Sequence, residues 1–328
     1  KPMTKKQTIF SAIQPSGELH IGNYLGALKN FVELQDKYDC FFFIADYHSI
    51  SGEYNPKEKS KQIFDLALDF LAIGLDPQKC TIAVQSQIPE HTELAWIFNT
   101  VTPLAELQRM TQFKDKSQNQ DQNINMGLLD YPVLQAADIL IYKAYGVPVG
   151  QDQIQHIELT RKIARFFNNK FGETFPEPKD LITKTPKIMS LIDPTKKMSK
   201  SHGKKSCIGI NDEPEMIKKK MRKAVSTTEY NEDIYSFYAS LLENFGTEKN
   251  KKYFLEQFKN KDIKFSELKD ALAEDISNHF KDFREKRKEL EKDPEKVKNI
   301  LSEGAEKARV IAKKTMREVK EKVGVIMG

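Results

Sequence analysis

The chain has 328 residues, of which 39% are hydrophobic, and this is enough apolar material for buried cores in two domains. Its formal net charge of +5 suits a polyanionic partner such as RNA, although many lysine-rich cytoplasmic proteins are equally basic. The three distant cysteines form no CxxC pair and no run of about 18 apolar residues occurs, which argues against a disulfide framework, a structural metal site and a membrane span.

The first predicted elements are a strand, a turn and a helix. Residues 1–6 are polar and contain no apolar targeting segment, so we expect a cytoplasmic protein. The apolar run Thr8–Ile13 indicates a buried strand, a Pro/Ser/Gly turn follows, and a helix is predicted from about Ile21 to Gln35. Its apolar residues recur at helical spacing, at Ile21, Leu25, Leu28 and Val32.

This strand, turn and helix N-terminus together predict a phosphate cradle. The first N–H groups of a helix have no partner within it and favour an anion. Gly22 and Gly26 allow a phosphate or a flat ring to approach the backbone, and His20 and Asn23 are close enough in sequence to reach one ligand. The simpler interpretation is that Gly17 only makes a turn and His20 only caps the helix.

Strands and helices alternate through the first half of the chain. The run Cys40–Ala45 is apolar on both faces, as a central parallel strand requires, and polar residues follow it at Asp46–Ser49. A helix, a third strand at Thr81–Gln85 and helical residues from about Thr92 to Phe113 come next. This order predicts an α/β fold with a Rossmann-like doubly wound parallel sheet, whose ligands bind at the carboxyl ends of strands near a switch point.

A carboxylate on an apolar helix marks a second candidate site. After a polar segment, a helix is predicted from Val133 onward, with Pro132 in its first turn. Gln135 and Asp138 lie three residues apart on one face of it, and Tyr131 lies at its entrance. Because a buried carboxylate needs a partner, we interpret Asp138 as a ligand-binding group; the alternative is a solvent-facing residue or a cap.

A fourth strand is predicted at Val147–Val149, followed by the turn Gly150–Gln153 and another helix. In this fold a strand-to-helix junction points at the ligand crevice, where Asp152 and Gln153 would offer acceptors to a ribose hydroxyl or a substrate amine. The alternative is that Asp152 is simply the N-cap of its helix.

The composition changes after about Asn211, where lysine-rich helical patterns replace strands. Helices are predicted at residues 214–225, 233–245, 251–259, 265–290 and 293–323. We therefore predict two domains, a catalytic domain of residues 1–210 and a C-terminal helical domain of residues 211–328. The basic helix faces are explained equally well by contact with RNA and by ordinary solvation.

A second motif, Lys197-Met198-Ser199-Lys200-Ser201, lies far downstream of His20-Ile21-Gly22-Asn23. In this order the two motifs resemble the HIGH and KMSKS signatures of class I aminoacyl-tRNA synthetases, and we call them the first and the second signature. Asn23 replaces the last histidine of the first signature, a departure that the tryptophan members commonly show. Nearly the whole chain resembles the bacterial-type tryptophanyl-tRNA synthetases, over Phe10–Gly26, Arg109–Lys116, Tyr131–Tyr142, Val147–Arg161 and Ile188–Ser201.

The resemblance implies ATP-dependent activation of L-tryptophan to tryptophanyl-adenylate, followed by transfer to the 3′ end of tRNA(Trp). It also implies a homodimer, Mg²⁺ accompanying ATP, and an anticodon-reading role for the helical C-terminal part. No protein-bound metal is predicted, and no general base is needed because the tryptophan carboxylate is already ionised.

The resemblance also assigns roles to residues. Positive charge near the departing pyrophosphate would come from Lys197, Lys200 and Lys116, with His20 and Asn23 completing the catalytic set. The residues expected to hold ATP are Gln14, Pro15, Ser16, His20, Gly22, Asn23, Gly150, Gln151, Asp152, Ile188, Lys197, Met198, Ser199, Lys200 and Ser201. The residues expected to contact tryptophan are Phe10, His48, Tyr131, Gln135, Asp138 and Gln153, with Asp138 accepting the indole N–H.

Other functions compete with this interpretation. Gln135 stands where methionine is common, and a Gln-x-x-Asp pair also occurs in tyrosyl-tRNA synthetases, but Phe10 replaces the tyrosine with which those enzymes bind the substrate hydroxyl. A paralogue that does not charge tRNA tends to lose the lysines of the second signature, and both are present here. A small-molecule nucleotidyltransferase would not need so long a helical domain.

Overall fold

The computed structural model describes residues 6–112, 125–182, 186–199 and 203–326. The chain forms two compact units, which we describe separately. The sheet unit comprises Lys1–Gly17, Asn30–Lys184 and Asp293–Gly328, and the helical unit comprises Glu18–Lys29 and Thr185–Lys292. Over the described ranges, no helix combines the length and the apolar character needed to cross a lipid bilayer.

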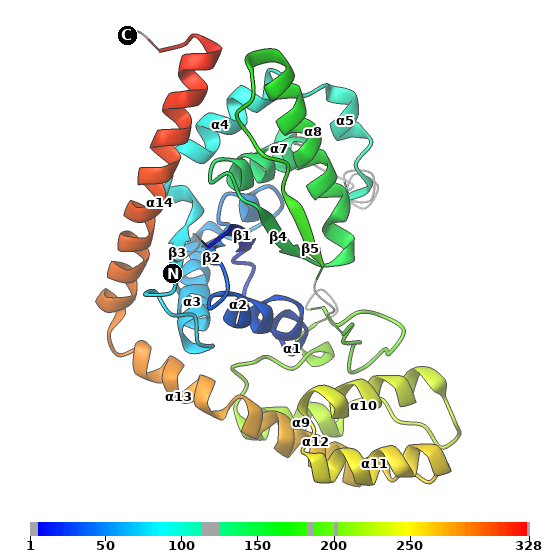
Figure 1. The fold of residues 1–328 in the computed structure, drawn as a ribbon. Coiled ribbons are helices and arrows are strands. Elements are labelled where there is room, and N and C mark those ends of the chain that lie inside the picture. The colour runs from blue at the N-terminus through cyan, green and yellow to red at the C-terminus, as the bar shows by residue number, and fades with distance from the viewer. Residues whose placement is uncertain (1–5, 113–124, 183–185, 200–202, 327–328) are drawn as a thin grey trace, which may run out of the picture. The chain divides into compact units, whose positions relative to one another are not determined.

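The sheet unit is built on five parallel strands in the order β3-β2-β1-β4-β5 (Figure 1). The bounds are Thr8–Ile13 for β1, Asp39–Ile44 for β2, Cys80–Val84 for β3, Gly146–Val149 for β4 and Lys179–Ile182 for β5. The chain places β2 and β3 on one side of β1 and then returns to place β4 on the other. This topology confirms the predicted doubly wound parallel sheet; the sequence analysis missed β5, a short and only partly buried edge strand.

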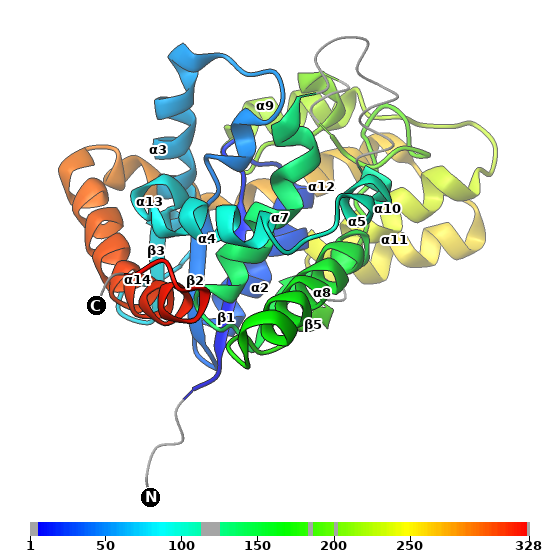
Figure 2. The same ribbon diagram turned by 90° about the horizontal axis from the view of Figure 1, so that it is seen from above.

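Both faces of the sheet are covered, as the apolar runs of the central strands require. Along β2, Phe42 faces the helix α2 (Lys29–Leu34) and stacks on Phe31 with ring centroids 4.3 Å apart. Its neighbours Phe41 and Phe43 point to the opposite face and join the core formed with helices α4, α7 and α8. Figure 2 shows α7 between α4 and α8 on that face. The remaining bounds in this unit are Pro56–Ala72 for α3, Glu90–Asn99 for α4, Leu104–Gln108 for α5, Met126–Leu140 for α7 and Ile154–Phe171 for α8.

Two helix predictions in this unit were wrong at their ends. The helix α7 begins at Met126, not at Val133, because the Asn125 side chain caps it by accepting from Leu128 N at 3.0 Å. Pro132 therefore lies inside the helix instead of in its first turn. The helical region predicted from Thr92 to Phe113 is divided into α4 and α5, with Pro103 as the residue before α5.

The last helix, α14 (Pro294–Val323), belongs to the sheet unit and runs along β3 and α4 (Figure 1). Ala308, Ala312, Thr315 and Val319 form a buried face of this helix, and Gly304 brings it so close to β3 that a Cβ would lie 1.9 Å from the Ile82 carbonyl oxygen. Trp96, the single tryptophan of the chain, is 72% exposed on α4. The observed units thus differ from a division at residue 210 in three segments. Residues 18–29 and 185–210 belong to the helical unit, and residues 293–328, which include α14, belong to the sheet unit.

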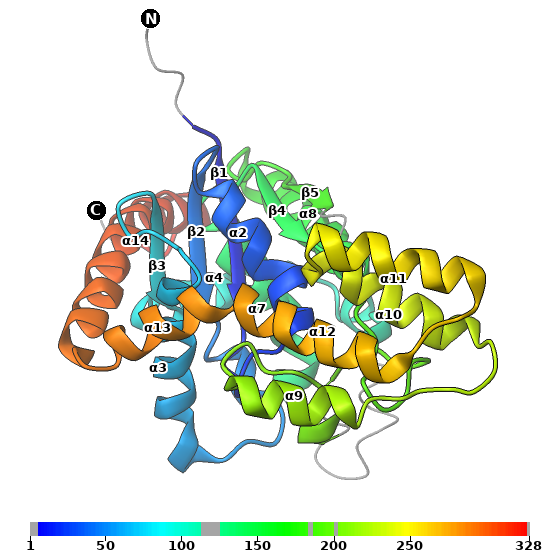
Figure 3. The same cartoon turned by 90° about the horizontal axis from the view of Figure 1, so that it is seen from below.

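The helical unit consists mainly of α9 (Pro214–Arg222), α10 (Glu232–Phe245), α11 (Glu248–Asn260), α12 (Phe265–His279) and α13 (Lys281–Leu290). In Figure 3, α12 packs beside α9, and α11 beside α10. The single helix predicted over residues 265–290 is broken at Phe280, whose buried ring contacts Tyr24 and Phe245. The helix predicted from Ile21 begins as α1 (Ile21–Asn23) and continues through a π-helical turn (Tyr24–Leu28) into α2.

Candidate active site

The carboxyl ends of β1 and β4 lie side by side at the switch point of the sheet, where ligands bind in folds of this kind. After β1, Ser16 N bonds to the Gln14 carbonyl oxygen at 2.9 Å, and Gly17 turns the chain with φ of 104°. Gln14 and Ser16 are exposed while Pro15 is buried. After β4, Gly150 leads into a 3₁₀ turn over Gln151–Gln153. The side chain of Asp152 lies outside the described residues, so its predicted role is open.

A lysine that sequence analysis missed stands at the first of these turns. Lys59, on α3, donates from Nζ to the Pro15 carbonyl oxygen at 3.1 Å. Burial lowers the pKa of Lys59, while the charge of Asp46 acts in the opposite direction. The turn that was predicted to bind a nucleotide is thus fixed by a cation from a helix well apart in sequence.

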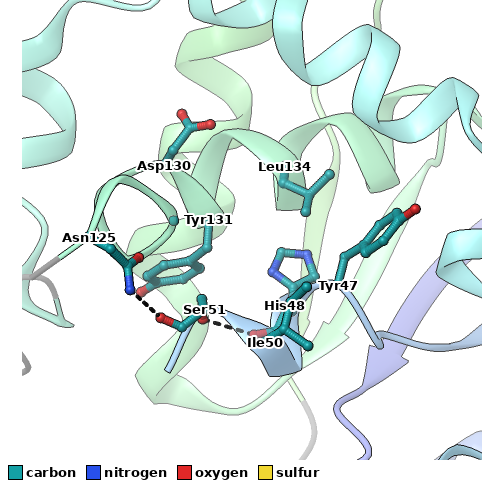
Figure 4. A pocket seen from close by; sticks show the side chains of 9 residues that line it. Tyr47, His48, Ile50, Ser51, Asn125, Asp130, Tyr131 and Leu134 are labelled. Atoms are coloured by element: carbon teal, nitrogen blue, oxygen red, sulfur yellow. Dashed lines mark hydrogen bonds between the residues drawn. The ribbon is translucent and has the colours of Figure 1, made fainter. Parts of the chain in front are cut away.

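A pocket of about 310 Å³ opens beside the end of β2 and the first turns of α7 (Figure 4). His48 and Tyr131, both predicted to contact substrate, line it, with ring centroids 6.4 Å apart. The other lining residues are Tyr47, Ile50, Ser51, Asn125, Gly127, Asp130 and Leu134. Its mixture of aromatic, apolar and few polar groups is typical of a small-molecule site.

Tyr131 is oriented by two polar neighbours. Its hydroxyl donates to Gln112 Oε1 at 2.9 Å and lies 2.8 Å from His156 Nε2. Burial raises the pKa of Tyr131 to about 12, so the hydroxyl stays protonated at neutral pH. His156, which the sequence analysis did not select, is 2% exposed and fixes this ring from α8.

Asp138 lies directly behind His48, is almost completely buried at 2% exposure, and is not itself among the residues that line the pocket. His48 Nε2 lies 2.8 Å from its Oδ2, His91 Nδ1 lies 2.8 Å from its Oδ1, and Gln85 Nε2 donates to both oxygens at 2.9 Å. Burial opposes the charge, but His91 and His48 outweigh burial and lower the pKa of Asp138 to about 2. The carboxylate is therefore ionised, hydrogen-bonded to His48 and Gln85 and in ion-pair contact with His91, as a buried charge requires.

Behind His91 the polar chain continues to Tyr142, whose hydroxyl oxygen lies 2.7 Å from His91 Nε2. His91 has no exposed surface and stacks on Phe43, with ring centroids 5.8 Å apart. Phe10 stacks on Tyr142 at 5.6 Å. Phe10 is thus a core residue beside this chain and is not among the residues that line the pocket; nor are Gln135 and Gln153, which are half-buried.

In the helical unit, the first signature folds as a helix cap. His20 Nδ1 accepts from Gly22 N at 3.1 Å and Asn23 N at 3.3 Å, and Asn23 Oδ1 accepts from His20 N at 3.0 Å. This reciprocal pairing is a capping box. His20 therefore caps the helix, as the simpler interpretation held. The segment is tied to residues further along the chain by the bond from Ile21 N to the Ile208 carbonyl oxygen at 3.0 Å.

The second signature lies in the same unit and begins on a short antiparallel bridge between Met189 and Lys197. Met198, which is 2% exposed, anchors it and bonds from its N–H to the Ile188 carbonyl oxygen at 2.9 Å, whereas the Lys197 side chain is exposed. An ideal Cβ at Gly22 of the first signature would lie 3.8 Å from Ile188 Cβ, and Ile188 is the residue to which Met198 of the second signature bonds. Lys116, Lys200 and Ser201 lie outside the described residues.

The sequence analysis missed the partners of Asp138 and Tyr131, namely Gln85, His91, Tyr142 and His156. One signal was available, because Gln85 follows β3 directly, just as Asp46 and His48 follow β2. Polar residues after neighbouring parallel strands meet at one sheet edge. Within the described part of the chain, no group of three or more His, Cys, Asp or Glu side chains is arranged to hold a metal ion.

Comparison with known proteins gives one consistent result. The family model described as "tRNA synthetases class I (W and Y)" matches residues 1–281. The tryptophan–tRNA ligase of Rickettsia conorii is 45% identical over 98% of this chain and 100% of its own length. The crystal structure of tryptophanyl-tRNA synthetase from Campylobacter jejuni complexed with ADP and tryptophan superposes with a TM-score of 0.86, at 35% identity, covering 97% of this chain and 99% of that one.

The fold extends to an enzyme for a different amino acid. Tyrosyl-tRNA synthetase from Archaeoglobus fulgidus, complexed with L-tyrosine, has a TM-score of 0.68 at 21% identity, covering 87% of this chain and 91% of that one. A likeness at that level of identity shows a common fold alone.

Proposed function

The chain belongs to the class I tRNA synthetases for tryptophan and tyrosine, and we infer that it is a tryptophan–tRNA ligase of the bacterial type. The observation that carries this inference is the match, from end to end, to relatives that bear this name. The enzyme activates L-tryptophan with ATP and transfers it to tRNA(Trp). We propose the roles of individual residues, the use of Mg²⁺, the assembly and the cellular location as follows.

In the first step a tryptophan carboxylate oxygen attacks the α-phosphorus of ATP. The bond from that phosphorus to the bridging oxygen of pyrophosphate breaks, and pyrophosphate leaves with the electron pair. Charge grows on the leaving group, so catalysis needs cations and N–H donors near it. Lys197, Lys200 and Lys116 are proposed to supply the cations. In the second step a hydroxyl at the 3′ end of tRNA attacks the tryptophanyl carbonyl, and AMP leaves.

The tryptophan side chain is proposed to enter the pocket lined by His48 and Tyr131, with its ring N–H directed at Asp138. A carboxylate has about four acceptor sites. His48, His91 and one N–H of Gln85 use three of them, which leaves one for a ligand. An aromatic amino acid without a ring N–H would leave that acceptor unpaired, and this favours tryptophan over phenylalanine. Gln153, Gln135 and Phe10 remain predicted substrate contacts.

ATP is proposed to bind the turns that follow β1 and β4 and the two signatures. Those turns hold Gln14, Pro15, Ser16, Gly150, Gln151 and Asp152, and the signatures add His20, Gly22, Asn23, Met198, Ser199 and Ser201, with Ile188 beside Gly22. Mg²⁺ is proposed to arrive with the nucleotide, since phosphate oxygens and water are the ligands it prefers.

Three further proposals follow from family membership. The helices α9–α13 are proposed to contact the tRNA anticodon, because they are rich in lysine and carry none of the strand ends at which ligands bind. The protein is proposed to act as a homodimer in the cytoplasm. Sedimentation of the purified protein would test the dimer directly.

The decisive experiment is ATP–pyrophosphate exchange with tryptophan and tyrosine supplied separately, followed by charging of tRNA(Trp). We expect exchange with tryptophan alone. Exchange with tyrosine would keep the fold and overturn the substrate. No exchange with either amino acid would favour the paralogue that does not charge tRNA.

A further inference from the structure

The buried chain from Tyr142 through His91 to Asp138 is not accounted for by contacts to substrate. His91 has no exposed surface and Tyr142 is 4% exposed, so neither is among the groups that line the pocket. Burial and the charges of Asp138 and Glu90 raise the pKa of Tyr142 well above its ordinary value, so its hydroxyl remains protonated. Three polar groups are thus kept away from water in the core of the sheet unit.

The geometry places the two ring nitrogens of His91 against different partners. Nδ1 lies 2.8 Å from Asp138 Oδ1, an ion-pair contact whose N–H direction falls outside hydrogen-bond geometry. Nε2 lies 2.7 Å from the Tyr142 hydroxyl oxygen. When the Tyr142 hydroxyl donates to Nε2, it selects the tautomer whose proton sits on Nδ1, next to Asp138.

The neighbouring aromatic rings prevent the His91 ring from turning away from Asp138. His91 stacks on Phe43 at 5.8 Å with 7° between the ring planes, and Tyr142 lies edge-on to it at 5.5 Å. Tyr142 is itself held between Phe10 at 5.6 Å and Phe41 at 4.7 Å, both stacked on its ring. Asp138 cannot change its rotamer without leaving a buried donor unpaired.

We propose that His91, with its tautomer set by Tyr142, is a positioning residue for amino-acid selection, holding Asp138 as an oriented acceptor for the ring N–H of the amino-acid substrate. This proposal rests on the proposed function, and it assigns a specificity role to side chains that do not touch the substrate. His48 differs from His91, because it lines the pocket and meets the other oxygen of Asp138.

The test compares tryptophan with its benzothiophene analogue, in which sulfur replaces the ring N–H. The measured quantity is the ratio of the two kcat/KM values in ATP–pyrophosphate exchange, which cancels any loss of folded enzyme. The unmodified enzyme should prefer tryptophan strongly. His91→Leu should lower that ratio roughly tenfold or more, since a close polar contact to a buried charge is lost. His91→Asn should keep most of it, because an amide N–H can take the place of Nδ1–H.

Two controls separate positioning from stability. Phe98→Leu makes a void in the same core, against Phe167 and Phe175, and should leave the ratio unchanged even if the protein is less stable. Tyr142→Phe keeps the ring and removes only the hydroxyl, so the ratio should fall roughly threefold. If His91→Leu does not fold, Tyr142→Phe and His91→Asn decide the matter.

The outcomes are distinct. An unchanged ratio in His91→Leu, or in Tyr142→Phe when the first variant is unfolded, overturns the positioning role while the proposed function stands. A ratio that falls equally in Phe98→Leu overturns it as well, because the effect would then belong to the core in general. Absence of tryptophan-dependent exchange in the unmodified enzyme overturns the proposed function and this inference with it.

Discussion

The groups around Asp138 and those of the second signature are held in opposite ways. Asp138 is buried, has three polar partners around it and is supported by a further hydrogen bond behind His91. The Lys197 side chain is exposed on an isolated bridge to Met189, next to the buried Met198. A group that selects between similar rings gains from a fixed geometry without water, whereas a group that stabilises a departing anion must release it again. We therefore propose that the two regions serve different kinetic steps.

The largest effect should follow from Asp138→Asn. This substitution keeps the shape of the side chain and removes its charge from the buried cluster. Two histidines and Gln85 would then face a neutral group, and kcat/KM for tryptophan should fall roughly 10³-fold. The KM for ATP should change less than threefold. Both constants come from pyrophosphate exchange at varied tryptophan and varied ATP.

The matched control is Asp130→Asn, a carboxylate that, unlike Asp138, lines the pocket, and that accepts from Asn99 Nδ2 at 2.9 Å. We expect this substitution to lower kcat/KM for tryptophan less than fivefold. Equal losses in the two variants would mean that the pocket senses total charge and that the Asp138 cluster selects nothing.

Lys197→Ala should slow adenylate formation about 10²-fold, the order seen when one preorganised donor is removed. Because the side chain is exposed, the urea midpoint should not move, and tryptophan affinity measured by calorimetry should stay the same. The control is Lys196→Ala, at an adjacent exposed lysine paired with Asp193 at 3.2 Å. This substitution should hardly change the rate of adenylate formation. A tryptophan affinity that falls with the rate in Lys197→Ala would contradict the separation of the two regions.

The pH dependence of stability should differ between the wild type and Asp138→Asn. A folded-state pKa of about 2, below the ordinary 3.8, means that ionised Asp138 stabilises the fold above about pH 4 and that this contribution is lost as pH falls toward 2. Between pH 5 and pH 3 the wild type should lose about 1 kcal/mol more unfolding free energy than the variant. Urea titrations at both pH values measure the difference, and parallel losses would show that Asp138 is not held ionised.

Gly22→Ala should give the smallest effect, and only in the helical unit. The new Cβ would lie 3.0 Å from His20 Nδ1 and Cε1, so the capping ring must shift by a few tenths of an ångström. We expect a loss of about 1 kcal/mol in stability and a few-fold rise in the KM for ATP, with the preference for tryptophan over its benzothiophene analogue intact. A changed preference would show that the two regions are coupled in amino-acid selection.

Much of the sheet could be predicted from sequence, because a central parallel strand is apolar on both faces and few other segments are. The run Cys40–Ala45 predicted β2 within one residue at each end. The edge strand β5 could not be found in this way, because Lys179–Ile182 is short and half polar. Likewise, the helix over residues 293–323 was predicted correctly as α14, but a helical pattern does not say which surface the helix packs against, and here that surface is β3.

The candidate site shows the same limit. His48, Tyr131 and Asp138 could be selected because polar residues in apolar surroundings stand out, and the structure does bring Asp138 and His48 together at 2.8 Å. His91 could not be selected, since it lies in the polar segment after β3 and only the fold shows that it is buried. Phe10 was chosen for a missing hydroxyl, whereas its ring stacks on Tyr142 in the core.

Trp96 links the synthesis of this chain to the supply of tryptophan. It is the single tryptophan among 328 residues, and its side chain is mostly exposed on α4, where many other residues would serve. Each copy of this chain therefore draws one tryptophan from the pool that it converts into charged tRNA. When tryptophan is depleted, a ribosome that translates these 328 residues meets one codon for which charged tRNA is scarce.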